Sequence, residues 1–229
     1  MNIEELQTAY KSILGYERFW NCVSIENACD GFLWCSVNPG KEKGNEQFND
    51  RWENLRDEGR SKYWTTLMRK LGRHLNQFGH MDLFPIHCSD EFAFIQRHIG
   101  MENSDEFKQF EELLKVSQEF IESLRPKLIV YSNASTSYLW GWPRGDWMGY
   151  KLKPVTLSSP VSSGRISRKP NESLFRITGI NDFEEVIKET KNTVLAGTYL
   201  LLDNQNDNHF GHPEINAEDL DSIITQLDM

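Results

Sequence analysis

The hydrophobic positions along this chain switch repeatedly between helical and strand spacing, and the order of the segments predicts the fold class. Apolar residues at helical spacing predict helices over Ile3–Leu14, Tyr63–Phe78, Ser104–Leu124 and Ala217–Leu227. Short apolar runs bounded by turn residues predict strands over Phe32–Val37, His80–Phe84, Leu128–Tyr131, Pro154–Ser158, Leu174–Thr178 and Val194–Asp203. Alternation of strands with helices indicates an α/β fold, with a largely parallel sheet covered on both faces.

The strand over Phe32–Val37 stops abruptly at a turn of sequence Asn38-Pro39-Gly40. In parallel sheets, ligands bind beyond the carboxyl ends of the strands. The turn therefore lies at the edge of the sheet where a binding site is expected. Taken alone, Asn38 is better explained as an ordinary turn residue.

Length and composition set the domain organisation. A chain of 229 residues, 38% of them hydrophobic, can bury one well-packed core, so we expect one domain over residues 1–229. No apolar stretch approaches the ~20 residues that span a bilayer, and the first residues are amphipathic and acidic. We therefore expect a monomeric, cytoplasmic protein with no membrane partner.

The four cysteines lack the C-x-x-C spacing of zinc and iron–sulfur sites. We expect reduced, mostly buried thiols, with no metal and no other cofactor. A hydrolase site built from Cys88 with His87 or His80 is disfavoured, because adjacent residues of a strand point to opposite faces and no supporting motif follows.

The net charge of -9 argues against nucleic-acid binding, but the distribution of the charge weakens that argument. Residues 59–81 and 147–171 each contain five cations and no carboxylate, whereas residues 181–229 contain eleven carboxylates and two lysines. Such segregation favours a basic face that binds a polyanion. Cations on ordinary solvated faces are the competing interpretation.

Three segments, in this order, resemble the uracil-DNA glycosylase superfamily. The first is "SVNPG" (Ser36–Gly40), similar to the strand-end motif of its mismatch-specific and single-strand-selective branches. The second is "SLRPKLIVYSN" (Ser123–Asn133), and the third is "KPVTLSSPVSSGRIS" (Lys153–Ser167). The resemblance covers roughly Phe32–Ser167. It implies a three-layer α/β/α sandwich with a central, mainly parallel four-stranded sheet, to which extra C-terminal strands are added.

The resemblance implies a catalytic role for Asn38. A glycosylase flips a nucleotide out of the DNA and hydrolyses the bond between base and sugar. The amide oxygen of Asn38 would orient the attacking water, while Pro39 and Gly40 keep the turn tight and allow close approach to the DNA. The family also stacks an aromatic residue on the flipped base. Phe48 is the candidate, with Trp52 as its rival and an ordinary core position as the alternative.

Asp82 departs from the family pattern, which places a base-reading Asn at the corresponding strand. An ionised Asp only accepts hydrogen bonds, so it suits an amino-bearing base such as a modified cytosine better than uracil. A cap or an ion pair at the strand end is the alternative role for Asp82.

The second family motif, usually His-Pro-Ser or Asn-Pro-Ser, is also altered here. The matching loop reads Ser158-Ser159-Pro160, and its hydroxyls are weaker donors to an oxyanion than an imidazolium is. The imidazole would come instead from His212, or His209, in "NDNHFGHPEIN", unless that segment only precedes a helix capped at Asn216. The residues expected to contact DNA are Ser159, Ser162, Ser163, Arg165, Arg168 and Lys169.

These observations predict a monofunctional DNA glycosylase that releases uracil or a modified cytosine from duplex or single-stranded DNA. One branch of the superfamily serves anti-phage defence by removing glucosylated hydroxymethylcytosine. The Trp- and Gly-rich segment Tyr138–Tyr150 is compatible with a pocket widened for such a base, or with an outer packing layer. A non-catalytic nucleic-acid or nucleotide binding protein with the same fold is the alternative function.

Overall fold

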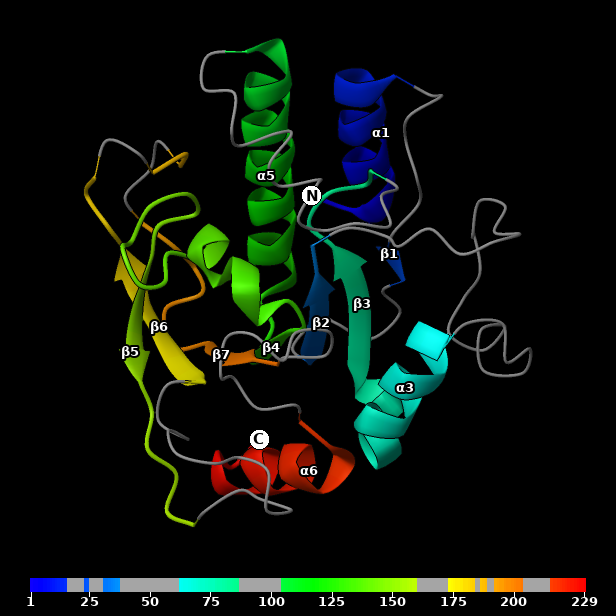
Figure 1. Ribbon diagram of the computed structural model, residues 1–229, viewed down its shortest axis with the longest axis vertical. Helices are drawn as coiled ribbons and strands as arrows, with labels where there is room; N and C mark the ends of the chain where they lie inside the picture. Colours follow the sequence, from blue (N-terminus) through cyan, green and yellow to red (C-terminus); the bar gives the residue numbers. More distant parts are fainter. Residues whose placement is uncertain are drawn as a thin grey trace.

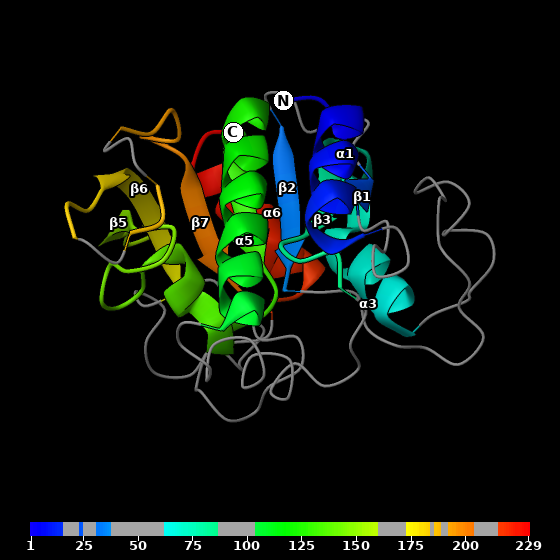
Figure 2. The ribbon, with the colours of Figure 1, turned by 90° about the horizontal axis from the view of Figure 1, so that it is seen from above.

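The computed structural model of the chain describes residues 1–15, 23–24, 31–37, 62–86, 104–159, 173–183, 186–188, 192–203 and 215–229. Its centre is a seven-stranded sheet with the strand order β1-β3-β2-β4-β7-β6-β5 (Figures 1 and 2). The strands are Val23–Ser24 (β1), Phe32–Ser36 (β2), Phe78–Asp82 (β3), Leu128–Tyr131 (β4), Tyr150–Pro154 (β5), Leu174–Ile180 (β6) and Tyr199–Leu202 (β7).

The middle of the sheet is a block of four parallel strands, β3, β2, β4 and β7. At one edge the two-residue β1 pairs antiparallel with β3. At the other edge β6 pairs antiparallel with β7, and β5 pairs antiparallel with β6. The predicted α/β architecture, a four-stranded parallel centre with extra strands late in the chain, is confirmed.

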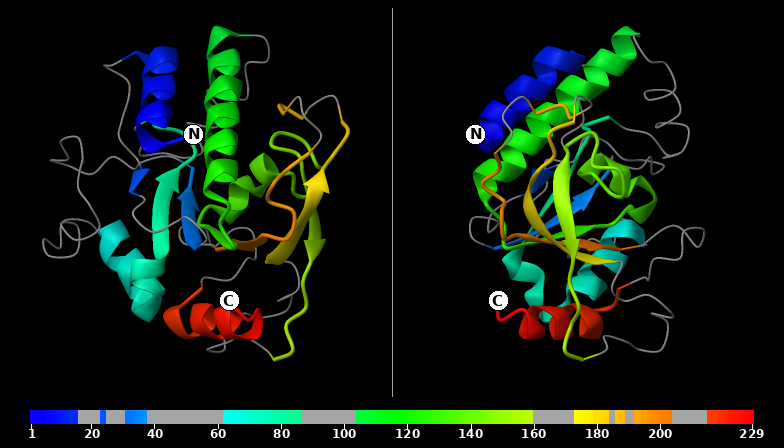
Figure 3. Two further views of the ribbon diagram at one scale, coloured as in Figure 1. Left: turned by 180° about the vertical axis from the view of Figure 1, so that it is seen from behind. Right: turned by 90° about the vertical axis from the view of Figure 1, so that its left-hand side faces the viewer.

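Helices cover both faces of this sheet (Figure 3). On one face lie α1 (Ile3–Leu14) and α5 (Asp105–Leu124), and on the other lie α3 (Lys62–Leu71) and α6 (Ala217–Gln226). Two 3-10 helices, η1 (Gly72–Gln77) and η2 (Ala134–Trp140), follow α3 and β4. The side chains of each central strand alternate between the two cores, so these strands are buried on both faces.

Capping side chains account for several helix boundaries. At the start of α1, the Asn2 side chain accepts a hydrogen bond from the Glu5 amide, and the Glu5 carboxylate accepts one from the Asn2 amide. The same reciprocal pair, Asn216 with Asp219, begins α6, which confirms Asn216 as a helix cap. Because such caps are local in sequence, the predicted starts of these helices agree with the structure.

The helix predicted over Tyr63–Phe78 is too long. The α-helix ends at Leu71, a 3-10 helix continues to Gln77, and Phe78 already belongs to β3. Gly79, the residue directly after the predicted helix, lies inside β3 opposite Leu33 of β2. The neighbouring Phe78 pairs with Phe32 and is buried in the sheet, so tertiary contacts override the helical spacing.

Two late strands are displaced from their predicted positions. The strand predicted over Pro154–Ser158 ends, rather than begins, at Pro154, because β5 is an edge strand with exposed lysines and a weak apolar signal. The strand predicted over Val194–Asp203 begins only at Tyr199. Residues 194–197 form a turn, in which Gly197 has a φ of 105° that favours glycine.

The Trp- and Gly-rich segment Tyr138–Tyr150 packs against the core on the α5 face of the sheet. Trp140 and Tyr150 are fully buried, and their ring centroids lie 6.0 Å apart. The ring centroids of Trp142 and Phe175 lie 4.5 Å apart. These contacts favour the packing layer over the wall of a widened pocket.

Candidate active site

Polar residues lie in a row where the four parallel strands end. Ser36 of β2 is in register with Asp82 of β3, and Ser132 and Asp203 directly follow the paired residues Tyr131 of β4 and Leu202 of β7. We call Asp82, Ser36, Ser132 and Asp203 the strand-end row. Each residue of the row is at most 5% exposed. Each of them lies two positions after Trp34, His80, Val130 or Leu201 in the chain. Side chains two positions apart on a strand point to the same face, so the row lies on the sheet face covered by α3 and α6.

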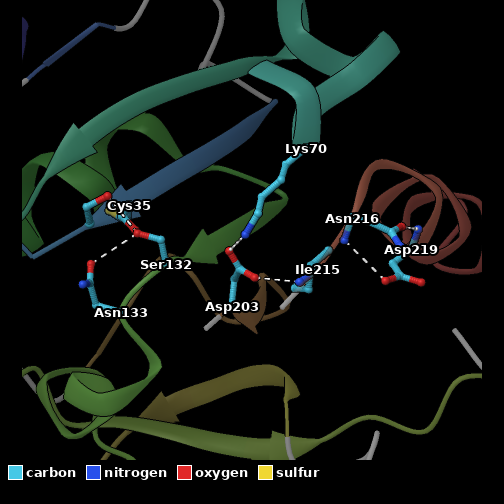
Figure 4. Close-up of polar contacts among 9 residues, drawn as sticks. Cys35, Lys70, Ser132, Asn133, Asp203, Ile215, Asn216 and Asp219 are labelled. Atoms are coloured by element: carbon cyan, nitrogen blue, oxygen red, sulfur yellow. Dashed lines mark hydrogen bonds and ion pairs between the residues drawn. The ribbon is translucent and has the colours of Figure 1, made fainter. Parts of the chain in front are cut away.

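Hydrogen bonds join the ends of β2 and β4. The hydroxyl oxygens of Ser36 and Ser132 lie 2.9 Å apart. The amide of Val37 donates to the Asn133 side-chain oxygen at 3.0 Å, and the Ser132 hydroxyl lies 3.2 Å from the same oxygen. Figure 4 shows Ser132 between Asn133 and Cys35. The backbone of β2 is therefore tied to β4 at the residue directly before Asn38.

This junction is also the topological switch point of the parallel block. From β2 the chain passes through α3 to β3 on one side, whereas β4 lies on the other side of β2. Connections that leave neighbouring strands in opposite directions open a crevice at their carboxyl ends, where ligands of α/β proteins bind. The side chains that border this position are those of Ser36, Ser132 and Asn133.

A buried ion pair closes the other end of the row. The Lys70 ammonium of α3 donates to the Asp203 carboxylate at 2.8 Å, and the two side chains are 4% and 0% exposed. The second carboxylate oxygen accepts a hydrogen bond from the Ile215 amide, directly before the Asn216 cap of α6 (Figure 4). One carboxylate thus joins α3, β7 and α6.

Burial favours the protonated form of Asp82. It raises the pKa of the carboxyl from 3.8 to about 8, and a hydrogen bond with the Ser36 side chain opposes that rise. Burial therefore opposes the ionised Asp82 that we expected. A sequence cannot show that the carboxyl has left water. A neutral carboxyl offers both a donor and an acceptor, as an amide does, so it does not by itself favour an amino-bearing base.

Asp82→Asn is expected to change the pH dependence of stability. Between about pH 4 and pH 8, the folded protein keeps a proton on Asp82 that the unfolded chain has released, so this residue's contribution to stability falls as the pH rises. Asn has no such proton. The free energy of unfolding of the variant, relative to wild type, should therefore rise from about pH 4 to about pH 8 and then level off, as urea titrations would show. A difference that is constant with pH would contradict the assignment.

Most residues predicted for the site lie outside the described part of the chain. Those residues are Asn38, Pro39, Gly40, Phe48, Ser162, Ser163, Arg165, Arg168, Lys169 and His212. Asp82 is described. It is in register with Ser36, and Ser36 lies two residues before Asn38 in the chain. Ser159 is exposed, and its backbone exchanges hydrogen bonds with the Gln226 side chain at the end of α6, so it does not belong to the strand-end row.

Ser36, Ser132, Asn133 and Asp203 had no predicted role, and Lys70 was expected on a basic face. A usable signal existed for the first four, because each lies within two residues of the carboxyl end of a predicted buried strand. Lys70 carried no such signal, since its partner is 133 positions away.

Fewer cations of residues 59–81 are available for a basic face than we expected. Lys70 is buried against Asp203, and Arg73 forms an ion pair with Asp221. On the β5–β6 hairpin, Lys153 and Arg176 are paired in register and exposed. Among the described cations, these two on the hairpin are better placed than Lys70 to contact phosphates.

Over the described ranges, no group of three or more His, Cys, Asp or Glu side chains is placed to hold a metal ion. In that same part of the chain, no helix has the length and apolar character needed to cross a membrane. Cys35 is a buried free thiol on the face of the sheet opposite the strand-end row.

Comparison with models of known protein families and with curated protein sequences gives no match for this chain.

Proposed function

We propose that this protein is a monofunctional DNA glycosylase, which hydrolyses the bond between a flipped base and its sugar. The observation that carries the proposal is the hydrogen bond from the Val37 amide to Asn133, which fixes the end of β2 at the switch point of the sheet. Asn38 is the next residue along the chain. An amide side chain at that position is well placed to act on a ligand in the crevice.

In the proposed reaction, the Asn38 amide oxygen orients a water molecule toward C1′ of the sugar. The water oxygen forms a bond to C1′ as the bond from C1′ to the base nitrogen breaks, and the electron pair leaves with the base. The water releases its proton to solvent, and the departing base takes one up. An amide does not accept a proton at neutral pH, so Asn38 acts by orientation and not as a strong base.

The remaining parts of the proposal concern binding. Asp82 borders the base from the neighbouring strand, Phe48 stacks on it, and His212 donates to the negative charge that develops on it. Ser162, Ser163, Arg165, Arg168 and Lys169 contact the DNA backbone together with the exposed Lys153 and Arg176.

The function is tested with a panel of labelled oligonucleotides, both duplex and single-stranded. Each carries one uracil, hypoxanthine, cytosine, 5-hydroxymethylcytosine or glucosylated 5-hydroxymethylcytosine. Base release is scored as strand cleavage by alkali at the abasic site, and we expect it for at least one member of the panel. Absence of abasic sites from every member would contradict the glycosylase function.

Non-catalytic DNA binding is the second candidate. The altered second motif favours it, because Ser158-Ser159-Pro160 stands where the family carries His-Pro-Ser or Asn-Pro-Ser, and hydroxyls are weaker donors to a developing oxyanion. Fluorescence anisotropy with the same oligonucleotides separates the two functions. Tight binding without base release identifies the binding protein.

Asn133→Ala is expected to slow base release by about tenfold to a hundredfold, because a displacement near 1 Å at a catalytic group can cost that much. The change removes the acceptor for the Val37 amide without touching Asn38. Single-turnover rates measure the effect. Asn192→Ala is the control, since Asn192 is exposed and precedes β7, whereas the site lies where β7 ends. Equal rates for both variants would remove Asn133 from the mechanism.

A further inference from the structure

We propose that the β5–β6 hairpin carries a phosphate-binding surface of its own, which contacts the DNA backbone about four nucleotides from the flipped base. The surface consists of Lys151, Lys153 and Arg176, which we call the hairpin cations. The inference rests on the proposed function. It adds a contact region on the antiparallel part of the sheet, beside the parallel strands that carry the proposed site.

The strand pattern places the hairpin cations on one face of the sheet. Leu152 of β5 and Phe175 of β6 pack in the core on the α5 face. Each hairpin cation is the direct chain neighbour of one of these two residues, so its side chain points to the opposite face. All three are exposed.

The helices of that opposite face lie elsewhere. Among the described elements, β5 packs mainly on β6, while β6 packs on β5 and β7. The two helices of this face, α3 and α6, pack on each other and on the core of the central strands. Figure 1 shows the hairpin on the side of the molecule farthest from α3. The hairpin cations are therefore accessible to a partner.

The positive charge of this surface is not balanced by carboxylates of the hairpin itself. β5 and β6 contain the three cations and no carboxylate. Lys153 and Arg176 stand directly opposite each other in register, and like charges in that arrangement repel. Lys151 lies 3.9 Å from the exposed Asp182. In a chain with 34 carboxylates and 25 cations, this local excess of positive charge points to an anionic partner.

The phosphates of a nucleic acid fit this surface better than a protein or a membrane does. Protein interfaces are centred on apolar or aromatic anchors, and membrane-binding faces insert apolar side chains. The exposed large apolar residues of the described structure are Met1, Phe183 and Val194, and none of them belongs to β5 or β6. Cations without such anchors suit contacts to phosphate oxygens, which position DNA without reading its sequence.

The sheet sets the distance between the hairpin and the proposed site. β5 runs parallel to β7, because both are antiparallel to β6, so Lys153 lies toward the carboxyl edge of the block. Three strand spacings of about 4.8 Å each separate β4 from β5, which gives about 14 Å. A DNA strand advances about 3.4 Å per nucleotide, so this distance spans about four nucleotides. The hairpin contacts the DNA on one side of the flipped base only.

The first test measures how the affinity for DNA depends on salt. Anisotropy is followed with a labelled duplex of about 20 base pairs carrying one central uracil, for wild type and for the double variant Lys153→Gln with Arg176→Gln. Each lost phosphate contact lowers the slope of the logarithm of the binding constant against the logarithm of the salt concentration by about 0.9. We therefore expect a slope lower by about 1.8 in the double variant.

The matched control is Lys108→Gln with Lys127→Gln, which changes the net charge by the same amount. Lys108 is exposed on α5, and the exposed Lys127 directly precedes β4, at the edge opposite the proposed site. The slope of the control should stay close to that of wild type. Equal slopes for the two double variants overturn the inference, whether or not any base is released. Circular dichroism verifies folding, and loss of a repulsive pair should leave the hairpin variant at least as stable as wild type.

The second test locates the contact along the DNA. It uses the duplex whose base is released, shortened to about two base pairs on one side of that base or on the other, which is less than the four-nucleotide distance. On one of the two shortened duplexes, wild type and the hairpin variant should bind equally. A weaker hairpin variant on both duplexes overturns the placement.

The two proposals fail in different ways. Base release together with equal slopes overturns the hairpin surface and leaves the glycosylase standing. A lower slope in the hairpin variant without base release from any oligonucleotide overturns the glycosylase and supports the hairpin surface as part of a DNA-binding protein.

Discussion

Lys70→Ala is expected to lower the free energy of unfolding by about 3 to 5 kcal/mol, which is the usual cost of removing one partner from a buried ion pair. The truncation leaves the Asp203 carboxylate fully buried, with the Ile215 amide as its remaining hydrogen-bond donor among the contacts described above. It also removes the side chain whose ammonium lies 6.0 Å from the ring centroid of Trp34. Urea unfolding followed by circular dichroism measures the change.

The matched control is Lys108→Ala, which removes an exposed lysine of α5 whose nearest carboxylate is 4.0 Å away. Such pairs contribute about 0 to 1 kcal/mol, so this variant should stay close to wild type. A double variant, Lys70→Met with Asp203→Asn, keeps the acceptor for Ile215 and removes both charges. It should be more stable than the sum of the single changes predicts. A loss below about 1 kcal/mol in Lys70→Ala would contradict a buried charge pair.

Asn38→Ala is expected to lower the single-turnover rate of base release by about a hundredfold or more, because loss of orientation of a reacting group by about 1 Å can cost that much. The affinity for DNA should change little, because Asn38 is proposed to contact the water and phosphate contacts supply a large share of DNA affinity. Rates and anisotropy on the same oligonucleotide separate these two effects. A variant that binds normally and does not release the base is the expected outcome.

Asn38→Asp distinguishes orientation from proton transfer. A carboxylate can hold the water and can also accept its proton, so this variant should retain more activity than Asn38→Ala and should lose it at acidic pH. Asn192→Ala again serves as the control. Wild-type rates in Asn38→Ala would show that another group directs the water.

The fold could be predicted from the sequence wherever the determining signals are local. The bounds of α1 agree because its cap, Asn2 with Glu5, lies within one turn of its start, and β4 agrees because Pro126 and the polar Ser132 delimit it. The end of the helix predicted over Tyr63–Phe78 was misplaced because Phe78 pairs with Phe32 of β2, far away in the chain. Local pattern cannot show which strands become neighbours.

The candidate site was predictable in outline and not in its chemistry. The sequence places Asp82 in the middle of a strand predicted over His80–Phe84. Its position as the last residue of β3, and the burial that favours its protonated form, follow only from the fold. Lys70 resembled a surface cation because its carboxylate partner comes from the last strand. The hydrogen bond from the Val37 amide to the Asn133 side chain joins two segments far apart in the chain. The apolar pattern of one segment does not show that it meets the other.

The order of strands in the sheet has a consequence for assembly. β7 is the last of the described strands, yet it lies between β4 and β6, so within the described sheet the β5–β6 hairpin pairs with the parallel block through β7. Until residue 202 has been synthesised, the block has three strands and the hairpin has no place in the sheet. Insertion of a strand between two earlier ones is a non-local event that slows folding. Asp203 directly follows β7, so the ion pair between Lys70 and Asp203 can form when the last strand is in place.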